Sequence, residues 1–222
     1  MDLAVPLSKR QIKAANELQL ILAEGSPTDR ALYALSDRFP GFDSDAVLLK
    51  VAAINQLYYT NVWAVTRMAR HVAKVMNGPN ASKRDYELIE ELAALPKSER
   101  QQSNRNHLSF ASKFAHFFID AEAFPIYDTF AVRMIVHHLG WQATIPDLLH
   151  PYQAFFKNFS SLKKGADLSC TTRELDSYLW LAGLYREWKK SGDKARINTE
   201  VLRLFGDRSE KVQTILDALG HN

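Results

Sequence analysis

Apolar residues recur along most of this chain at the three- and four-residue spacing of an amphipathic α-helix. Alternating runs of Val, Ile and Thr, which are typical of strands, are nearly absent, and no pair of them flanks a tight turn. The pattern therefore predicts an all-α protein, a compact multi-helix domain of about eight to ten helices. The predicted helices cover residues 8–24, 26–39, 44–76, 82–95, 108–122, 128–139, 146–164, 172–188 and 209–219.

Capping residues and helix breakers set several of these boundaries. Gly25 suits the position just past the end of the first helix, and Ser26 with Pro27 suits the start of the second. The third predicted helix contains a Tyr-Thr-Asn sequence at 59–61, where helix formers give way to β-branched and amide residues. We therefore expect the third helix to break there.

Length and composition are those of an ordinary globular protein. The chain has 222 residues, of which 46% are hydrophobic and 24% charged, enough to bury a core in one large domain or in two smaller lobes. We expect one helical domain over 1–222, in which a lobe of residues 44–140 carries the site and 1–43 packs against it together with 141–222. The formal net charge of +3 permits a nucleic-acid partner without requiring one.

The sequence shows no sign of a disulfide framework, a zinc knuckle, an iron–sulfur cluster or a membrane span. Cys170 is the only cysteine, and each of those cysteine sites needs more than one. No apolar run approaches the length that crosses a bilayer, and the N-terminus carries no charged-then-apolar leader. We expect a cytoplasmic protein with no membrane contact.

One lysine stands beside a strongly aromatic helical stretch. In the sequence Ser-Phe-Ala-Ser-Lys-Phe-Ala-His-Phe-Phe, which starts at Ser109, four phenylalanines share one helix face and Lys113 lies at the edge of that face. Partial desolvation at such an edge favours the neutral, nucleophilic form of an amine. The alternative is a lysine whose stem covers the phenylalanines while its head stays in water. Spacing alone leaves both interpretations open.

Asp128 follows a proline-containing turn, Phe-Pro-Ile-Tyr at 124–127, and begins the next predicted helix. Aspartate is a preferred N-cap because its carboxylate accepts hydrogen bonds from the exposed amides of the first turn. A carboxylate held in this way stays ionised and could stabilise a developing positive charge, such as that of an oxocarbenium-like sugar. The alternatives are a cap with no further role and a surface ion pair with Lys113.

The segment from Leu108 to Asp128 resembles the catalytic segment of the helix-hairpin-helix DNA glycosylases. In that family a helix bearing a lysine, a proline-containing turn and a helix-initial aspartate follow in this order. The resemblance implies that Lys113 attacks the sugar C1′ and that Asp128 assists departure of the base. It also implies two helical lobes flanking a cleft, double-stranded DNA with an extruded base as the partner, and no cofactor. Outside this segment the likeness is one of architecture.

The glycine-rich hairpin that precedes the lysine in this family is replaced here by Ser-Phe-Ala-Ser at 109–112. In the family those glycines let backbone amides approach a DNA phosphate. We expect the phosphate contacts of this chain to come instead from nearby polar and basic side chains. The candidates are Asn104, Arg105, Asn106 and Ser109.

A glycosylase must hold the extruded base between apolar faces, with polar groups reading its edge. The segment from Asn55 to Asn61 mixes amides and tyrosines inside an otherwise apolar stretch, and polar groups buried there need partners. A bound base is one such partner, and ordinary core packing is the alternative for each aromatic. The pocket candidates are Asn55, Tyr58, Tyr59, Asn61, Trp63, Asp176, Tyr178 and Trp180.

The sequence predicts no metal or nucleotide site. His137 and His138 are adjacent rather than three or four residues apart, and glycine-rich phosphate loops are absent. His116 and Asp120, four residues apart, could pair on one helix face. The sequence thus favours a DNA glycosylase that excises a damaged or modified base, with or without lyase activity. The alternative is a non-catalytic helical module that binds nucleic acid or protein.

Overall fold

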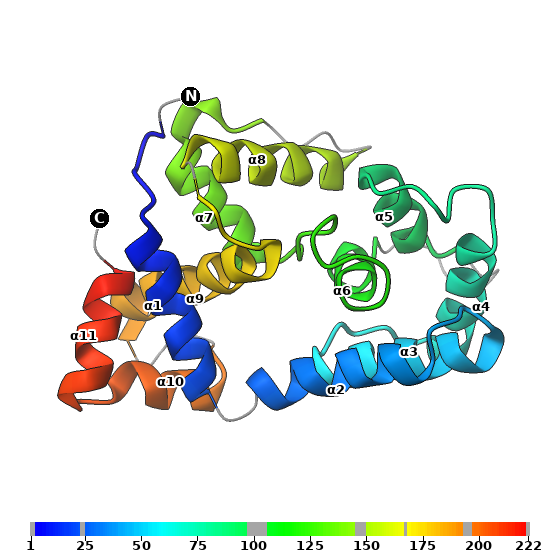
Figure 1. Cartoon of the computed structure of the whole chain (residues 1–222), viewed down its shortest axis with the longest axis horizontal. Coiled ribbons are helices and arrows are strands. Elements are labelled where there is room, and N and C mark those ends of the chain that lie inside the picture. Colours follow the sequence, from blue (N-terminus) through cyan, green and yellow to red (C-terminus); the bar gives the residue numbers. More distant parts are fainter. Residues whose placement is uncertain are drawn as a thin grey trace. The chain divides into compact units, whose positions relative to one another are not determined.

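The computed structural model describes residues 3–22, 25–96, 106–144, 150–166, 168–192 and 197–220. Within these ranges the chain is all-helical, with eleven α-helices, one short 3₁₀ helix and no strand, as the apolar spacing predicted (Figure 1). The elements are α1 (Lys9–Ile21), α2 (Gly25–Arg38), α3 (Ser44–Leu57), α4 (Val65–Met76), α5 (Tyr86–Ala93), α6 (Leu108–Phe118), α7 (Thr129–Leu139), η1 (Gly140–Gln142), α8 (Pro151–Gly165), α9 (Thr172–Ser191), α10 (Thr199–Gly206) and α11 (Glu210–Leu219).

Side-chain caps begin several helices where the sequence predicted a start. The hydroxyl of Ser8 accepts from the backbone N–H of Gln11 at 3.3 Å, and the Gln11 side chain accepts from the Ser8 N–H at 2.9 Å. Thr171 and Glu174 form the same reciprocal arrangement at the start of α9. Each capping box satisfies amide donors that the first turn of a helix leaves exposed.

Several parts of the chain differ from the predicted helices, among them α5, which begins at Tyr86 rather than at 82, and α6, which ends at Phe118 rather than at 122. α1 ends at Ile21, and Gly25 begins α2 rather than closing the preceding helix. The segment that forms α10, for which the apolar spacing predicts no helix, starts from the N-cap Asn198 and buries Phe205. A helix of only eight residues offers too few apolar positions for a clear period.

The predicted long helix over 44–76 divides into α3 and α4, as its Tyr-Thr-Asn sequence predicted. Tyr59 and Asn61 both take left-handed backbone angles, with φ of 49° and 56°, which residues other than glycine adopt at a cost. The side chain of Asn77 donates to the carbonyl of Phe42 at 3.1 Å, so the end of α4 lies beside the start of α3. The two helices therefore form an antiparallel pair.

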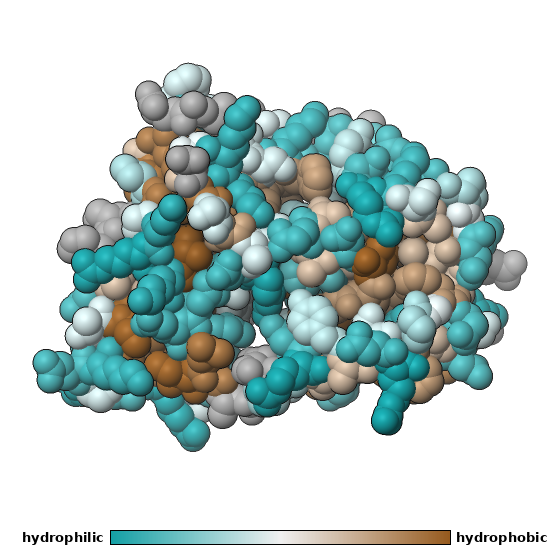
Figure 2. Space-filling view, viewed as in Figure 1, coloured by the Kyte–Doolittle hydropathy of each residue, from teal (hydrophilic) through white to brown (hydrophobic). Residues whose placement is uncertain are grey.

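The chain forms two compact units that interleave along the sequence. The sequence-based expectation was a different division, with 44–140 in one lobe and 1–43 together with 141–222 in the other. On the face drawn in Figure 2, hydrophilic residues cover most of the surface, with apolar areas between them. The first unit contains residues 1–27, 128–145 and 155–222, and the second contains 28–127 and 146–154.

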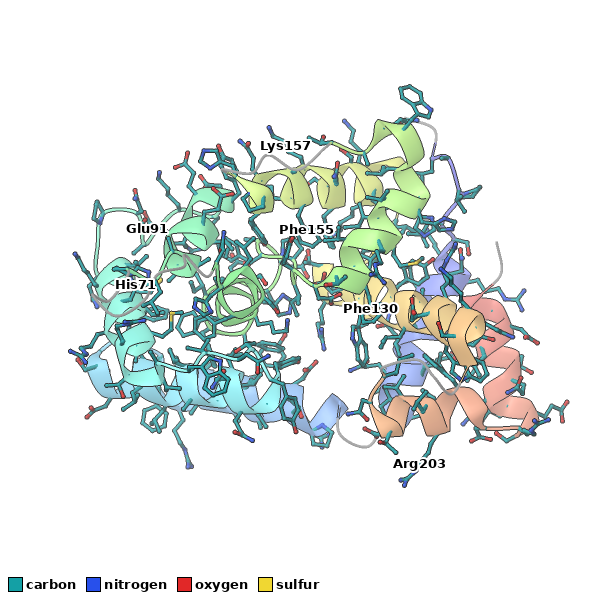
Figure 3. All side chains as sticks on the ribbon, turned by 180° about the vertical axis from the view of Figure 1, so that it is seen from behind. His71, Glu91, Phe130, Phe155, Lys157 and Arg203 are labelled. Atoms are coloured by element: carbon teal, nitrogen blue, oxygen red, sulfur yellow. The ribbon has the colours of Figure 1, made fainter. Side chains whose placement is uncertain are left out.

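In the first unit α9 packs against α1 and α7, and α1 also packs against α11. Gly183 of α9 faces α7 at a point where a Cβ would lie 2.8 Å from the Cβ of Phe130, which Figure 3 labels. Since no side chain fits at that distance, the glycine sets how closely the two helices approach. Buried leucines, among them Leu18, Leu175 and Leu216, fill the core of this unit.

In the second unit α6 packs against α3 and α5, and α4 packs against the same two helices. The Nε2 of His71 on α4 lies 2.9 Å from the backbone carbonyl oxygen of Glu91 on α5 (Figure 3). This contact joins α4 to α5. Val51 of α3, Met68 of α4 and Leu92 of α5 are fully buried. The second unit thus has a core of its own, into which the helix bearing Lys113 is built.

Candidate functional site

α6 carries Lys113, and this helix is buried on nearly every side. Of residues 108–118, only Ser109 is not buried. The ring centroids of Phe110 and Phe114 lie 5.9 Å apart, and the ring of Phe117 lies 5.3 Å from the ring of Tyr33 on α2. Aromatic contacts at these distances fix the orientation of the helix within the second unit.

Lys113 is itself buried, with 7% of the residue exposed. Its amine donates to the hydroxyl oxygen of Ser109 at 2.8 Å and lies 5.7 Å from the centre of the Tyr58 ring. The alternative prediction, a lysine whose head stays in water, is therefore wrong. The amine is held against a hydroxyl and an aromatic face, two groups that suit a cationic or hydrogen-bonding nitrogen.

Residues of α2 that the sequence pattern did not single out belong to the same surroundings. The hydroxyl of Tyr58 donates to the carboxylate of Asp29 at 2.5 Å, and the rings of Tyr58 and Phe117 lie 5.6 Å apart. Asp29 and Tyr33 are four residues apart, so both lie on the same face of α2. This four-residue spacing is the sequence pattern from which a shared position of Asp29 and Tyr33 could have been predicted.

Two side chains hold the turn that leads from α6 to α7. The Nδ1 of His116 lies 2.9 Å from the carbonyl oxygen of Phe124, and the hydroxyl of Tyr152 donates to the carbonyl of Pro125 at 2.7 Å. Because a carbonyl only accepts, the Nδ1 of His116 carries a proton. The local pair that the spacing of His116 and Asp120 allows is not formed, and the Asp120 carboxylate accepts instead from backbone amides that follow it.

Asp128 is the N-cap of α7, as predicted, and its carboxylate accepts from the backbone N–H of Ala131 at 2.8 Å. The residue before it, Tyr127, donates its backbone N–H to the hydroxyl of Ser112 at 2.9 Å. Ser112 is in turn the residue before Lys113. The chain therefore holds the immediate neighbours of the two candidate catalytic residues against each other.

Of the predicted base-pocket residues, Asn55 lies on α3, and Tyr58, Tyr59, Asn61 and Trp63 lie on the connection between α3 and α4. Asn55 braces this loop: its Oδ1 accepts from the Val62 N–H at 2.8 Å and from the Thr60 hydroxyl at 3.1 Å, and its Nδ2 donates to the Val62 carbonyl at 3.2 Å. Tyr59 and Trp63 are 75% and 85% exposed. The amide of Asn55 thus supports the loop and both rings lie mostly in solvent, and a role of these residues in a base pocket stays a prediction.

The remaining pocket candidates are divided between the two units. Asn61 is exposed on the same loop of the second unit, whereas Asp176 is buried and Trp180 half-buried on α9 of the first unit. Tyr178, also on α9, is fully buried and lies within 2.9 Å of the ring of His138. Tyr178 is thus a core residue rather than the wall of a base pocket.

The phosphate candidates precede α6 or begin it. Asn104 and Arg105 lie outside the described residues. Asn106 is exposed, and Ser109 is half-buried in the first turn of the helix. The Ser109 hydroxyl holds the amine of Lys113, and its contact with a phosphate stays a prediction.

Among the residues that the structure describes, no group of three or more His, Cys, Asp or Glu side chains could hold a metal ion. The helices in this part of the chain also include none with the length and apolar composition needed to cross a membrane.

The fold and site define an all-helical protein of two interleaved units, with a buried lysine in the second. The family described as HI_0787_N, an N-terminal domain, matches residues 9–122, and the chain belongs to this family. The matched range runs from α1 through α6 and includes Lys113. A protein of Haemophilus influenzae (strain ATCC 51907 / DSM 11121 / KW20 / Rd), described as an uncharacterized protein, is 28% identical over 159 residues, which cover 68% of this chain and 71% of that protein. No solved structure matches the chain.

Proposed function

We propose that this protein is a DNA glycosylase with lyase activity, in which Lys113 is the nucleophile. The observation that carries the proposal is the hydrogen bond from Tyr127 to Ser112, which holds the residue before Asp128 against the residue before Lys113. A nucleophile needs a fixed backbone, and this bond fixes the backbone next to Lys113 within the second unit. The resemblance of this segment to the catalytic segment of the helix-hairpin-helix DNA glycosylases supports the same assignment.

The proposed substrate is double-stranded DNA in the cytoplasm, from which a damaged or modified base is extruded. The free amine of Lys113 attacks the sugar C1′, so that an Nζ–C1′ bond forms and the bond from C1′ to the base breaks. The base leaves with the electron pair of that bond and takes a proton from the Nζ of Lys113, which is now bonded to C1′. The nitrogen lone pair then expels the ring oxygen, which takes the remaining proton of that nitrogen, and a Schiff base joins Lys113 to C1′. This chemistry uses no cofactor.

Two further groups have roles in this proposal. The hydroxyl of Ser109, 2.8 Å from the amine, fixes the direction in which Lys113 points. The carboxylate of Asp128, held by the N–H of Ala131, stabilises the positive charge that develops on the sugar as the base departs. A cap is suited to this task because its carboxylate needs no reorganisation during the reaction.

Borohydride trapping on duplexes that carry different modified bases tests the proposal. The wild-type protein should form a covalent adduct with at least one duplex, and Lys113→Gln should form none. Asp128→Asn should slow adduct formation by roughly a hundredfold. Lys164→Gln, which changes an exposed lysine of α8, is the matched control and should trap as the wild type does.

The non-catalytic module makes a different prediction for the same experiment. It requires that no tested duplex loses a base and that Lys113→Gln binds DNA as tightly as the wild type. That combination would overturn the glycosylase and leave a binding protein in which Lys113 and Asp128 are structural.

A further inference from the structure

The second unit contains a segment in which all formal charge is positive. From Ala46 to Arg84 the chain has six Lys and Arg residues and no Asp or Glu. Lys50 is fully buried, and Lys83 and Arg84 form ion pairs with acidic residues beyond the segment. The other three all lie on α4, and they are Arg67, Arg70 and Lys74.

α4 presents this charge on the side away from the core. Met68, Val72 and Val75 are buried, whereas Arg70 and Lys74 are exposed. These two basic residues are four positions apart, which is one helical turn and about 6 Å along the axis. Neither forms an ion pair with another residue in the described part of the chain. The helix thus offers a row of cations to a partner.

The loop just before α4 presents two exposed aromatic rings. Tyr59 and Trp63 are 75% and 85% exposed. Rings left in solvent do not contribute the free energy that their burial would add to folding. Tyr59 and Asn61 are also held in the left-handed region, and the three hydrogen bonds of Asn55 maintain that conformation. Strain that the surroundings maintain, together with exposed aromatics, is typical of a binding surface.

We propose that the loop at 59–64 and the outward face of α4 bind single-stranded nucleic acid. The bases stack on Tyr59 and Trp63, and the neighbouring phosphates contact Arg70 and Lys74. Stacking on aromatic side chains beside a cationic row is the general means of binding unpaired strands, because every base has a π-face and every phosphate a charge. The rigid loop lowers the entropy lost when the rings are engaged. We name this region the α3–α4 surface.

A polyanion suits the α3–α4 surface better than a protein partner does. The central parts of protein–protein interfaces are depleted of lysine, whereas here Lys74 and Arg70 lie on the same helix face, with no acidic residue on α4 to balance them. Their charge would be left without a counterion in an apolar interface. The phosphates of a nucleic acid supply that counterion directly. The α3–α4 surface goes beyond the chemistry proposed at Lys113 and does not depend on it.

Fluorescence anisotropy with a labelled oligothymidylate of about a dozen nucleotides measures this binding on the full chain. Trp63→Ala should weaken it by about tenfold or more, the amount that one stacked base contributes. Arg70→Glu with Lys74→Glu should weaken it further and flatten its dependence on salt. Trp63 is mostly solvent-exposed, so its removal leaves the fold intact, which the thermal unfolding curve verifies.

The matched control is Trp141→Ala, since Trp141 is 90% exposed but belongs to the first unit. This variant should bind the oligothymidylate as the wild type does. Photocrosslinking with 5-iodouridine should label a peptide that contains residues 59–64. Equal binding by Trp63→Ala and Trp141→Ala, or labelling elsewhere alone, would overturn the proposal. So would binding of anionic lipid vesicles through Trp63 with no binding of the oligothymidylate.

The same variants separate this proposal from the glycosylase. Lys113→Gln should abolish trapping and leave oligothymidylate binding unchanged. A protein that binds the oligothymidylate through Trp63 but releases no base supports the α3–α4 surface and contradicts only the chemistry. Loss of binding in Lys113→Gln to the same extent as in Trp63→Ala would contradict a separate surface.

Discussion

The Nε2 of His138 and the hydroxyl of Tyr178 lie 2.9 Å apart in the interior of the first unit, where both residues are fully buried. The Nδ1 of the same imidazole lies 2.9 Å from the carbonyl oxygen of Val5. Because a carbonyl only accepts, Nδ1 carries the proton and Nε2 accepts from the tyrosine. This network joins the N-terminal segment to α7 and α9, and a neutral ring satisfies it.

The stability of the protein should therefore depend on pH through His138. Burial, with smaller contributions from the nearby His137 and Arg186, lowers the pKa of His138 from 6.5 to about 4. Between these values the unfolded chain binds a proton that the folded chain does not, so the free energy of unfolding falls as the pH falls. We expect a loss of about 2 kcal/mol between about pH 7 and about pH 5, measured by urea unfolding.

Two variants isolate this effect. His138→Gln should remove most of the difference between the two pH values, whatever it costs at neutral pH. Tyr178→Phe keeps the titrating ring and removes its donor, so it should lose about 1 kcal/mol and retain the pH dependence. A pH dependence of equal size in the wild type and His138→Gln would contradict the prediction.

Asn55 should be worth more to stability than its half-buried position suggests. Its side chain makes three hydrogen bonds to the loop that contains the left-handed residues Tyr59 and Asn61. Asn55→Ala leaves loop groups without these partners and should cost about 2–3 kcal/mol, read from chemical unfolding. Proteolysis should then cut between α3 and α4 faster. Gln56→Ala, at the exposed neighbouring position, should do neither, and equal effects of the two variants would refute the assigned role.

Lys50 lies fully buried on α3, where its amine donates to the carbonyl of Gly41 at 2.9 Å and faces the ring of Phe42 at 4.6 Å. Burial lowers the pKa of Lys50 from its usual 10.5, and the Asp43 carboxylate opposes that shift. The folded state thus releases this proton before the unfolded chain does. The free energy of unfolding should gain from Lys50 as the pH rises from the folded pKa toward 10.5.

Lys50→Met and Lys50→Ala form a matched pair that tests this account. Met fills the same space without a charge to desolvate, so it should stay within about 1 kcal/mol of the wild type and lack the alkaline gain. Ala leaves a cavity and should cost about 2–4 kcal/mol. Unfolding curves near neutral pH and near pH 10 supply both readings, and an alkaline gain that persists in Lys50→Met would disprove the assignment.

Gly183 should tolerate no side chain. A Cβ there would lie 2.8 Å from the Cβ and 3.1 Å from the carbonyl oxygen of Phe130, and 3.2 Å from the Cγ of Met134. Gly183→Ala gains about 1 kcal/mol in helix propensity, but it must push α7 away from α9 and should cost about 1–3 kcal/mol overall. Gly206→Ala, where nothing lies within 4 Å of the added Cβ, is the control and should be neutral or stabilising in thermal unfolding.

Helix caps and helix breaks could be predicted from the sequence because each depends on residues that are close together along the chain. Asp128 as an N-cap, the capping box of Thr171 and the break at 59–61 all depend on residues within a few positions of each other. The burial of Lys113 was underestimated because a helical wheel places a residue only within its own helix. What covers α6 is decided by contacts distant in sequence, such as that of Tyr33 with Phe117.

The candidate site shows the same division. The order of lysine, proline turn and aspartate is legible in the sequence, but the hydrogen bond from Tyr58 to Asp29 joins residues 29 positions apart and has no local pattern. The exposed position of Trp63 was also not predictable, since the same mixture of amides and aromatics is typical of a pocket wall. Only the hydrogen bonds of Asn55 show that these residues form a braced loop.

Ser112 offers the most direct test of how α6 and α7 are connected. Its hydroxyl accepts from the Tyr127 N–H at 2.9 Å and lies 3.4 Å from the Ser109 carbonyl oxygen, and it has no part in the proposed bond-making steps. Ser112→Ala should cost about 1–3 kcal/mol in chemical unfolding, because a backbone donor loses its partner. It should also slow borohydride trapping by roughly tenfold or more, since a displaced catalytic group loses alignment.

Ser160→Ala is the control for Ser112→Ala, because it removes an exposed serine hydroxyl that also bonds to a carbonyl, that of Phe156. This variant should match the wild type in stability and in trapping. A Ser112→Ala protein that is destabilised but traps at the wild-type rate would show that the anchor serves folding alone. Slower trapping by Ser112→Ala, which still has the Lys113 amine, would show that the hydrogen bond to the Tyr127 backbone sets the geometry of the reaction.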